Sequence, residues 1–301
     1  MNSLPDRLTA IVDVGAAAID TPPSYQSMFD AGLCSVIGFE PQTTLWPRDC
    51  KNRTILPDVI GDGAPALLRI FSSPGMASIL APEWSMLDVL SPRAAGGREW
   101  GKHLHTEKVE TRRLDDIAII EHIDMLRMDA QGAELMILEG AGHKLAETVC
   151  VQTEVSFNTL YVGQPMFGDI HEFLTAKGFV FHTFTEFQVR TIGPSHGKGR
   201  HIIQADAVYV KDFRHMETWA EPQLQHMALI AHWCFGSDDL AYRCVQQLES
   251  ERAFMPVLED NVHANHCLGE SSYNGPDRTV ALSGSDGGRP DLAGSGLEQR
   301  G

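Results

Sequence analysis

Two acidic residues each stand where a short apolar run ends, at places suited to hold a ligand. Asp13-Val14-Gly15 closes the run Thr9 to Val14, and Glu40 closes a second run about 25 residues further on. A glycine after a strand lets the backbone approach a ligand closely. A carboxylate at the end of the second strand can accept hydrogen bonds from both ribose hydroxyls. Together the two features predict a site for a ligand that contains a nucleoside.

The loop after the first strand discriminates between nucleoside ligands. It reads Gly15-Ala16-Ala17-Ala18-Ile19-Asp20 and lacks the fingerprint G-x-G-x-x-G. The pyrophosphate of NAD needs glycine-lined backbone at this point, whereas S-adenosylmethionine has no phosphate and makes a milder demand. The loop therefore counts against a nicotinamide-dependent oxidoreductase more than against an enzyme that uses the methyl donor.

A third acidic residue, Asp129, follows the buried run Met125 to Met128, with Gly132 opening a turn and Glu134 at the start of a helix. Ligands of open α/β sheets lie at the carboxyl ends of the strands, so Asp129 is a candidate site residue. Glu134 has two interpretations. It is either a site residue or an acid that stabilises the positive end of its helix.

The elements that must position these acids alternate between strands and helices. Short apolar runs bounded by turns indicate buried strands, and apolar residues at helical spacing indicate helices. This alternation predicts an α/β fold with a doubly wound, Rossmann-like sheet. We expect strands over Thr9–Val14, Ser35–Phe39, Leu67–Phe71, Thr106–Glu110, Met125–Met128, Val149–Val155, Phe179–Phe184 and Ala205–Val210. We expect helices from near Ser24 to before Gly32, over Glu134–Leu145 and over Asp169–Lys177.

Beyond Lys211 the spacing of apolar residues predicts two helices, and Ser237 can cap the second of them. We therefore expect a main domain over residues 1–211 and a helical extension packed on it over 212–258. The rest of the chain, 259–301, is rich in Gly, Ser and Asp. Such a segment buries too little apolar surface to offset the entropy of ordering, so we expect a disordered tail.

Composition restricts the class of protein. The 301 residues are 43% hydrophobic, carry a formal net charge of -16 and include no apolar run near the length that spans a bilayer. This charge disfavours nucleic acid and acidic lipid surfaces, and Met1 to Arg7 does not resemble a signal peptide. We expect a cytoplasmic protein without nucleic-acid or membrane partners. The oligomeric state is left open.

Metal and redox sites are not expected either. No two of the six cysteines have the C-x-x-C spacing. The clusters His103-Leu104-His105 and His263-Ala264-Asn265-His266-Cys267 do not supply a complete tetrahedral set of ligands.

Short motifs in a fixed order resemble those of the FkbM family of methyltransferases, which use S-adenosylmethionine. The most specific is Arg127-Met128-Asp129-Ala130-Gln131-Gly132-Ala133-Glu134, followed by Leu138-Glu139-Gly140-Ala141. It is similar to the family segment K-x-D-x-E-G-x-E, which leads into a helix. The other matching pieces are Ile11-Val12-Asp13-Val14-Gly15-Ala16, Gly38-Phe39-Glu40-Pro41, Ser78-Ile79-Leu80, Leu114-Asp115-Asp116 and Thr153-Glu154-Val155. The ordered match covers roughly residues 9–210.

The resemblance implies a class I methyltransferase domain that binds S-adenosylmethionine and methylates a hydroxyl of a sugar or small metabolite. It also implies roles for six acids and glycines. In this interpretation the methionine part of the cofactor faces Asp13 and Gly15, the ribose faces Glu40, the adenine lies near Asp58 or Asp62, and the transferring methyl group lies beside Asp129.

Four residues depart from the family pattern. Ala17 and Ile19 replace the Asn and the second Gly of D-x-G-A-N-x-G, Gln131 replaces a glutamate, and Arg127 replaces a lysine. The altered loop favours one alternative, a degenerate member that binds a nucleoside or a partner protein without catalysis. A purely structural scaffold is a further alternative, but it does not explain why acids recur at strand ends.

Methyl transfer to an alcohol is helped by a base within hydrogen-bond reach of the hydroxyl. Asp129 and Glu154 are the candidates, because both are expected at the carboxyl edge of the sheet. His182 and His105 are alternatives, since imidazole titrates near neutral pH. Tyr161 is a candidate for lining the acceptor pocket.

Overall fold

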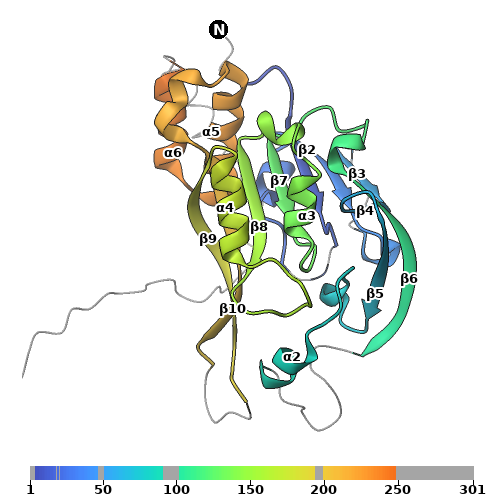
Figure 1. Ribbon diagram of the computed structural model, residues 1–301. Coiled ribbons are helices and arrows are strands. Elements are labelled where there is room, and N and C mark those ends of the chain that lie inside the picture. The colour runs from blue at the N-terminus through green and yellow to red at the C-terminus, as the bar shows by residue number, and fades with distance from the viewer. Residues whose placement is uncertain are drawn as a thin grey trace, which may run out of the picture.

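The protein contains a seven-stranded sheet and a small second sheet. The computed structural model describes residues 4–17, 19, 21–46, 51–90, 102–193 and 199–248. The predicted tail over 259–301 and the histidine cluster at 263–267 lie outside these ranges. The order in the large sheet is β3 (Arg53–Leu56), β2 (Cys34–Phe39), β1 (Thr9–Val14), β7 (Met125–Met128), β8 (Cys150–Ser156), β10 (His201–Lys211) and β9 (Phe179–Arg190) (Figure 1).

The pairing of these strands confirms the α/β fold with a Rossmann-like sheet. Five strands, β3, β2, β1, β7 and β8, are joined by parallel ladders, and β10 runs antiparallel between β8 and β9. The order reverses between β1 and β7, since the chain passes from β1 outward to β3 and later returns to the other side of β1. In open α/β sheets such a switch point leaves a crevice at the carboxyl ends of the strands.

Helices cover both faces of the large sheet. They are α1 (Gln26–Asp30), α3 (Glu134–Glu139), α4 (Phe167–Ala176), α5 (Glu221–Phe235) and α6 (Asp238–Gln247). The small sheet consists of β4 (Val59–Ile60), β6 (His103–Arg112) and β5 (Pro65–Phe71), and it lies beyond β3 with α2 (Trp84–Leu90) near its end (Figure 1). Strands were predicted within β5 and β6, whereas β4 was not predicted. Within the described ranges, no helix combines the length and apolar character needed to cross a bilayer.

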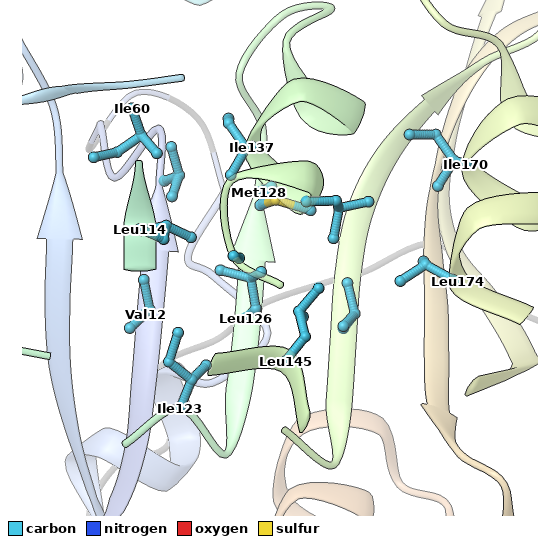
Figure 2. Close-up of a cluster of buried hydrophobic side chains, with 14 of the residues drawn as sticks. Val12, Ile60, Leu114, Ile123, Leu126, Met128, Ile137, Leu145, Ile170 and Leu174 are labelled. Atoms are coloured by element: carbon cyan, nitrogen blue, oxygen red, sulfur yellow. The ribbon is translucent and has the colours of Figure 1, made fainter. Parts of the chain in front are cut away.

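Alternation along the strands gives the sheet two apolar cores. Successive side chains of a strand point to opposite faces. On β1, Ile11 belongs to the core under α5 and α6, and the next residue, Val12, belongs to the core under α3 and α4. Figure 2 shows the second core, where Ile137 from α3 and Leu174 from α4 lie toward the strands. Burial on both faces explains why these strands are almost continuously apolar.

Some predicted bounds match, but the strand predicted over Phe179–Phe184 continues to Arg190 and the one predicted over Thr106–Glu110 extends over His103–Arg112. The predicted strands Thr9–Val14 and Met125–Met128 are confirmed residue for residue. The helix predicted over Glu134–Leu145 is wrong in extent, because α3 ends at Glu139 and a short 3-10 turn follows at Lys144–Ala146.

The interruption has a physical cause. A Cβ on Gly140 would lie 2.9 Å from the carbonyl oxygen of Gly61, so the backbone is in close approach there. The carboxylate of Asp115 accepts hydrogen bonds from the backbone N–H groups of His143 (3.1 Å) and Lys144 (3.1 Å), which starts the new turn.

The last helix begins after Ser237 as expected, although its cap differs. Gly236 has φ 60° and ends α5 in the left-handed conformation. Ser237 precedes α6 but its side chain makes no cap hydrogen bond. Its hydroxyl instead lies 2.7 Å from Nε2 of His182.

A buried histidine on α5 makes the stability of this packing depend on pH. His226 has no exposed surface, and its Nδ1 lies 3.0 Å from the hydroxyl of Thr9 on β1. Burial lowers the pKa of His226 to about 4, an effect that the nearby carboxylate of Asp124 only partly opposes. The folded protein therefore holds this histidine neutral.

We expect the free energy of unfolding to fall as the pH drops from about 6.5 toward 4, because only the unfolded chain then takes up a proton at His226. Relative to His226→Gln, the wild type should lose about 1 kcal/mol between pH 6.5 and 5.5. Urea unfolding of both proteins at these pH values measures the difference. Equal pH slopes would contradict a neutral buried histidine.

Candidate active site

A hollow lies at the switch point of the large sheet. It opens to solvent. The carboxyl ends of β1, β2 and β7 contribute Gly15, Glu40 and Asp129. The rest of its lining includes the apolar side chains Phe39, Val59, Ile60, Leu68 and Ile79. Asp58 lines it as well, so four of the predicted site residues meet at one cavity of mixed polar and apolar character.

Gly15 sits at a point where no side chain fits. Its φ is +84°, and a Cβ there would lie 2.1 Å from the backbone oxygen of Asp129. Its N–H donates to the carbonyl of Phe39 at 2.9 Å, and the N–H of Ala16 donates to the same carbonyl at 3.1 Å. The glycine thus lets the ends of β1, β2 and β7 close around the hollow.

Glu40 presents a carboxylate that is buried at the rim of this hollow. One oxygen accepts a hydrogen bond from the backbone N–H of Gln42 at 2.6 Å. Burial raises the pKa of Glu40 to about 7, and the negative charges of Asp129 and Asp13 add to the rise. Near neutral pH this group can take or release a proton, and its ionised form can accept two ligand hydroxyls.

Asp129 is the most accessible acid of the group, with its side chain 36% exposed. Its Oδ1 accepts a hydrogen bond from Nε2 of Gln131 at 2.8 Å, and its Oδ2 lies 3.9 Å from the guanidinium of Arg127. Its backbone N–H donates to the carbonyl of Val14 at 2.9 Å, which ties it to β1. A partly exposed carboxylate on a rigid strand end is well placed to accept a proton from a bound molecule.

A match to a family model shows to which family the chain belongs. The model of the methyltransferase FkbM domain matches residues 13–181, more than half of the 301 residues. The chain belongs to the FkbM methyltransferase family. This confirms the family that the sequence motifs predicted, and S-adenosylmethionine is accordingly its cofactor.

A curated relative and two solved structures are also similar to the chain. The relative is 2-O-methyltransferase NoeI of Sinorhizobium fredii (strain NBRC 101917 / NGR234), 42% identical over 69 residues, which are 22% of this chain and 28% of that protein. The match therefore spans well under a third of the relative's length.

The two structures are much more distant in sequence. One is magnesium protoporphyrin IX methyltransferase from Synechocystis PCC 6803 with bound SAM, 10% identical, covering 68% of this chain and 70% of that one with a TM-score of 0.31. The other is precorrin-6y C5,15-methyltransferase from Geobacter metallireducens GS-15, 15% identical, covering 68% and 82% with a TM-score of 0.32. Likeness at this level says nothing about the acceptor.

Asp13 of the FkbM motif lies outside the hollow. It is 2% exposed, and each of its oxygens already has a partner. Oδ2 accepts a hydrogen bond from the hydroxyl of Tyr25 at 2.6 Å, and Oδ1 accepts one from Nη1 of Arg127 at 2.8 Å. It lines an adjoining hollow, together with Arg53, and the two hollows share Ala17 and Ile19. Contact of Asp13 with the methionine part of the cofactor stays a prediction.

The two aspartates predicted near the adenine have different surroundings. Asp58 lines the hollow, and its Oδ1 accepts a hydrogen bond from Nη1 of Arg112 at 2.9 Å. Asp62 does not line it, and its Oδ1 accepts the backbone N–H of Ala64 at 2.8 Å. Of the two aspartates, Asp58 therefore fits the predicted place near the adenine better.

Glu154, the second predicted base, is 5% exposed and does not line the hollow. Its carboxylate accepts hydrogen bonds from three glutamine amides, of Gln131 and Gln188 at 3.2 Å each and of Gln204 at 2.5 Å. Burial raises the pKa of Glu154 well above its usual value, and the charge of Asp129 adds to this. Of the two predicted bases, the geometry favours Asp129.

Glu134 closes the turn that carries the family motif. Its carboxylate accepts hydrogen bonds from the backbone N–H groups of Ala130 at 2.9 Å and Gly132 at 3.0 Å. Burial raises the pKa of Glu134 to about 7. Its contacts are therefore with its own turn, and this favours a structural role.

The histidine alternatives lie away from the hollow. Nε2 of His182 forms a hydrogen bond with the hydroxyl of Ser237, and burial lowers the pKa of His182. His105 is exposed on β6, with Nε2 2.7 Å from the carboxylate of Glu107. Among the described residues, no group of three or more His, Cys, Asp or Glu side chains is arranged to hold a metal ion.

Gly15→Ala tests the close approach at the head of the FkbM motif. We expect a loss of about 2 kcal/mol or more of unfolding free energy, together with weaker cofactor binding, because the new methyl group pushes the ends of β1 and β7 apart. Gly178→Ala is the matched control, since its φ is +85° but nothing lies within 4 Å of the added Cβ. That variant should lose only about 1 kcal/mol. Equal losses would mean that the approach to Asp129 is unimportant.

The pKa of Glu40 leads to a second expectation. Ribose hydroxyls donate to the ionised carboxylate, so affinity for S-adenosylmethionine should rise as the pH increases through about 7. Calorimetric titration should give a dissociation constant about tenfold higher at pH 6 than at pH 8. Glu40→Gln should bind more weakly and lose most of this pH dependence. A variant with the same pH profile as the wild type would exclude Glu40 as the titrating group.

Proposed function

We propose that this protein transfers the methyl group of S-adenosylmethionine to a hydroxyl oxygen of a sugar or other small metabolite. The observation that carries the proposal is the carboxylate of Asp129, exposed at the same hollow that Gly15 and Glu40 border. This reaction needs three things from a protein in one cavity: a base, a tight backbone turn that a ligand can approach, and a carboxylate that accepts hydrogen bonds from the ribose hydroxyls.

The lining of the hollow fits the parts of the cofactor. Glu40 would accept the ribose hydroxyls, and the turn at Gly15 would lie along the methionine part. Apolar side chains, including Val59 and Ile60, would pack on the adenine, with Asp58 at its edge. The substituted loop residues Ala17 and Ile19 also line the hollow. They offer apolar contact where the usual family pattern has a polar Asn and a glycine.

The chemistry follows from the position of Asp129. S-adenosylmethionine supplies an electrophilic methyl group on a positively charged sulfur. As an electron pair of the acceptor oxygen forms the new bond to carbon, the carbon–sulfur bond breaks and its electron pair stays on sulfur. The carboxylate of Asp129 takes the hydroxyl proton, which raises the electron density on the attacking oxygen. The hollow contributes by aligning the two reactants, which removes much of the entropic barrier.

Two observations support oxygen as the methylated atom. The similar segment of NoeI belongs to a protein whose name specifies 2-O-methyl transfer. A carboxylate is also a suitable base for a hydroxyl, whose proton must leave as the bond forms.

Tyr161, which was predicted at the acceptor pocket, is 2% exposed, and its hydroxyl donates a hydrogen bond to Gln131. Its part in acceptor binding would then be indirect.

The experiment uses tritiated methyl groups. Protein and labelled S-adenosylmethionine are incubated with a panel of monosaccharides and hydroxylated metabolites, and label in a product that survives alkali identifies a methyl ether. Asp129→Asn should reduce the rate of transfer about a hundredfold or more, because it removes the base. Asp58→Asn is the control at the same hollow and should change mainly cofactor affinity. Unchanged transfer by Asp129→Asn would contradict the assigned role.

A further inference from the structure

Gln131 lies where three separate segments of the chain meet. It has φ 52° and is the one non-glycine residue with positive φ within the described ranges. Its backbone carbonyl accepts a hydrogen bond from the hydroxyl of Ser78 at 2.7 Å. A left-handed backbone is uncommon for a residue with a side chain and persists only where the surroundings hold it. This residue is therefore fixed by contacts and not by its own preference.

The side-chain amide of Gln131 joins two acids to a tyrosine. Nε2 donates to Oδ1 of Asp129 at 2.8 Å and to Oε2 of Glu154 at 3.2 Å. Oε1 accepts a hydrogen bond from the hydroxyl of Tyr161 at 2.8 Å. Because the buried phenol donates to the amide oxygen, the amide nitrogen must face the carboxylates. The orientation of the amide is thus set from a segment 30 residues away.

The carboxylate of Glu154, which accepts a hydrogen bond from Gln131, is also held in place. Glu154 is buried and is also held by the amides of Gln188 and Gln204. Gln131 is therefore anchored at Glu154 and at Tyr161, and it reaches from these anchors to Asp129, whose side chain is the partly exposed member of the group. A buried and fully bonded polar group of this kind restricts the residue next to it.

We propose that Gln131 is a positioning residue, which holds Asp129 at the edge of the hollow and keeps its charge available to the positively charged sulfur of the cofactor. The proposal rests on the proposed function, because it assumes that Asp129 stands beside the transferring methyl group. Gln131 itself does not need to touch the acceptor.

Charge explains why a neutral amide matters at this place. Among the described residues, Asp129 is paired with one cation, the guanidinium of Arg127 at 3.9 Å, which is shared with Asp13. Several acids from other elements act on the same region, namely Glu40, Glu134, Glu154 and Asp206. A third carboxylate between Asp129 and Glu154 would repel both and would favour uptake of a proton. The amide instead donates to both carboxylates.

The test compares S-adenosylmethionine with S-adenosylhomocysteine, which lacks the methyl group and the charge on sulfur. Calorimetric titrations at pH 7.5 measure both dissociation constants. Gln131→Met keeps the length of the side chain and removes its polar atoms. We expect it to weaken S-adenosylmethionine about tenfold and S-adenosylhomocysteine less than about threefold. Gln188→Met is the matched control, since it removes an amide from Glu154 but not from Asp129, and its ratio of the two constants should equal that of the wild type.

Gln131→Glu supplies a second readout that a purely structural role would not change. Glu40 supplies the pH dependence that both ligands share, so Gln131→Glu should add a further pH dependence to the binding of S-adenosylmethionine, because a carboxylate placed beside Asp129 favours uptake of a proton there. The profile for S-adenosylhomocysteine should shift less. This variant also keeps the inference testable if Gln131→Met does not fold.

The outcomes separate the inference from the function on which it rests. If folded wild-type protein binds neither ligand, the proposed function fails. If the wild type binds both, and the Gln131 variants weaken both equally or shift neither pH profile, Gln131 does not position the charge of Asp129 and the inference is overturned.

Discussion

The parallel pairing of β1 with both β2 and β7 is the constraint on which the rest of the structure depends. It brings the carboxyl ends of three strands to one edge and reverses the winding of the sheet there. Apolar side chains fill both faces below this edge. Acids that follow the strands, Glu40 and Asp129 among them, therefore gather at the opening. Gly15 permits this closeness, since any side chain there would collide with the backbone of Asp129.

Because the carboxyl ends of these strands meet, several acids lie close together, and this proximity has an energetic consequence. Burial raises the pKa of Glu40 and of Glu134 to about 7 and that of Asp206 to about 6, and Asp129 contributes to each rise. A raised pKa means that the folded state is favoured while the acid is protonated, and that this contribution is lost as the pH rises through the folded value. At neutral pH the ionised forms of these buried acids are thus electrostatically unfavourable. The main-chain ladders and the two apolar cores hold the fold together.

Much of the fold could be predicted because the sequence carries it locally. The strands Thr9–Val14 and Met125–Met128 are apolar runs ended by turns, and the ordered motifs placed Gly15, Glu40 and Asp129 at strand ends. The helix after Glu134 was predicted too long, because the turn that follows it is capped by Asp115, which lies about 28 residues earlier in the chain.

The rest of the site depends on contacts between segments far apart in the chain. Asp13 was predicted to face the cofactor, and its pairing with Arg127 depends on which residues of β1 and β7 are opposite each other. Gln131 was noted only as a departure from a family pattern, since its partners Ser78, Glu154 and Tyr161 come from three other segments. Spacing along the chain gives no signal for such contacts.

A crystal structure of the protein with S-adenosylhomocysteine tests the central claim most directly, which is that the hollow at the switch point holds the cofactor. We expect the ribose hydroxyls to bond to the carboxylate of Glu40 and the sulfur to lie beside Asp129. Density for the ligand confined to the adjoining hollow, beside Asp13, Arg53 and Arg127, would contradict the assignment of both acids.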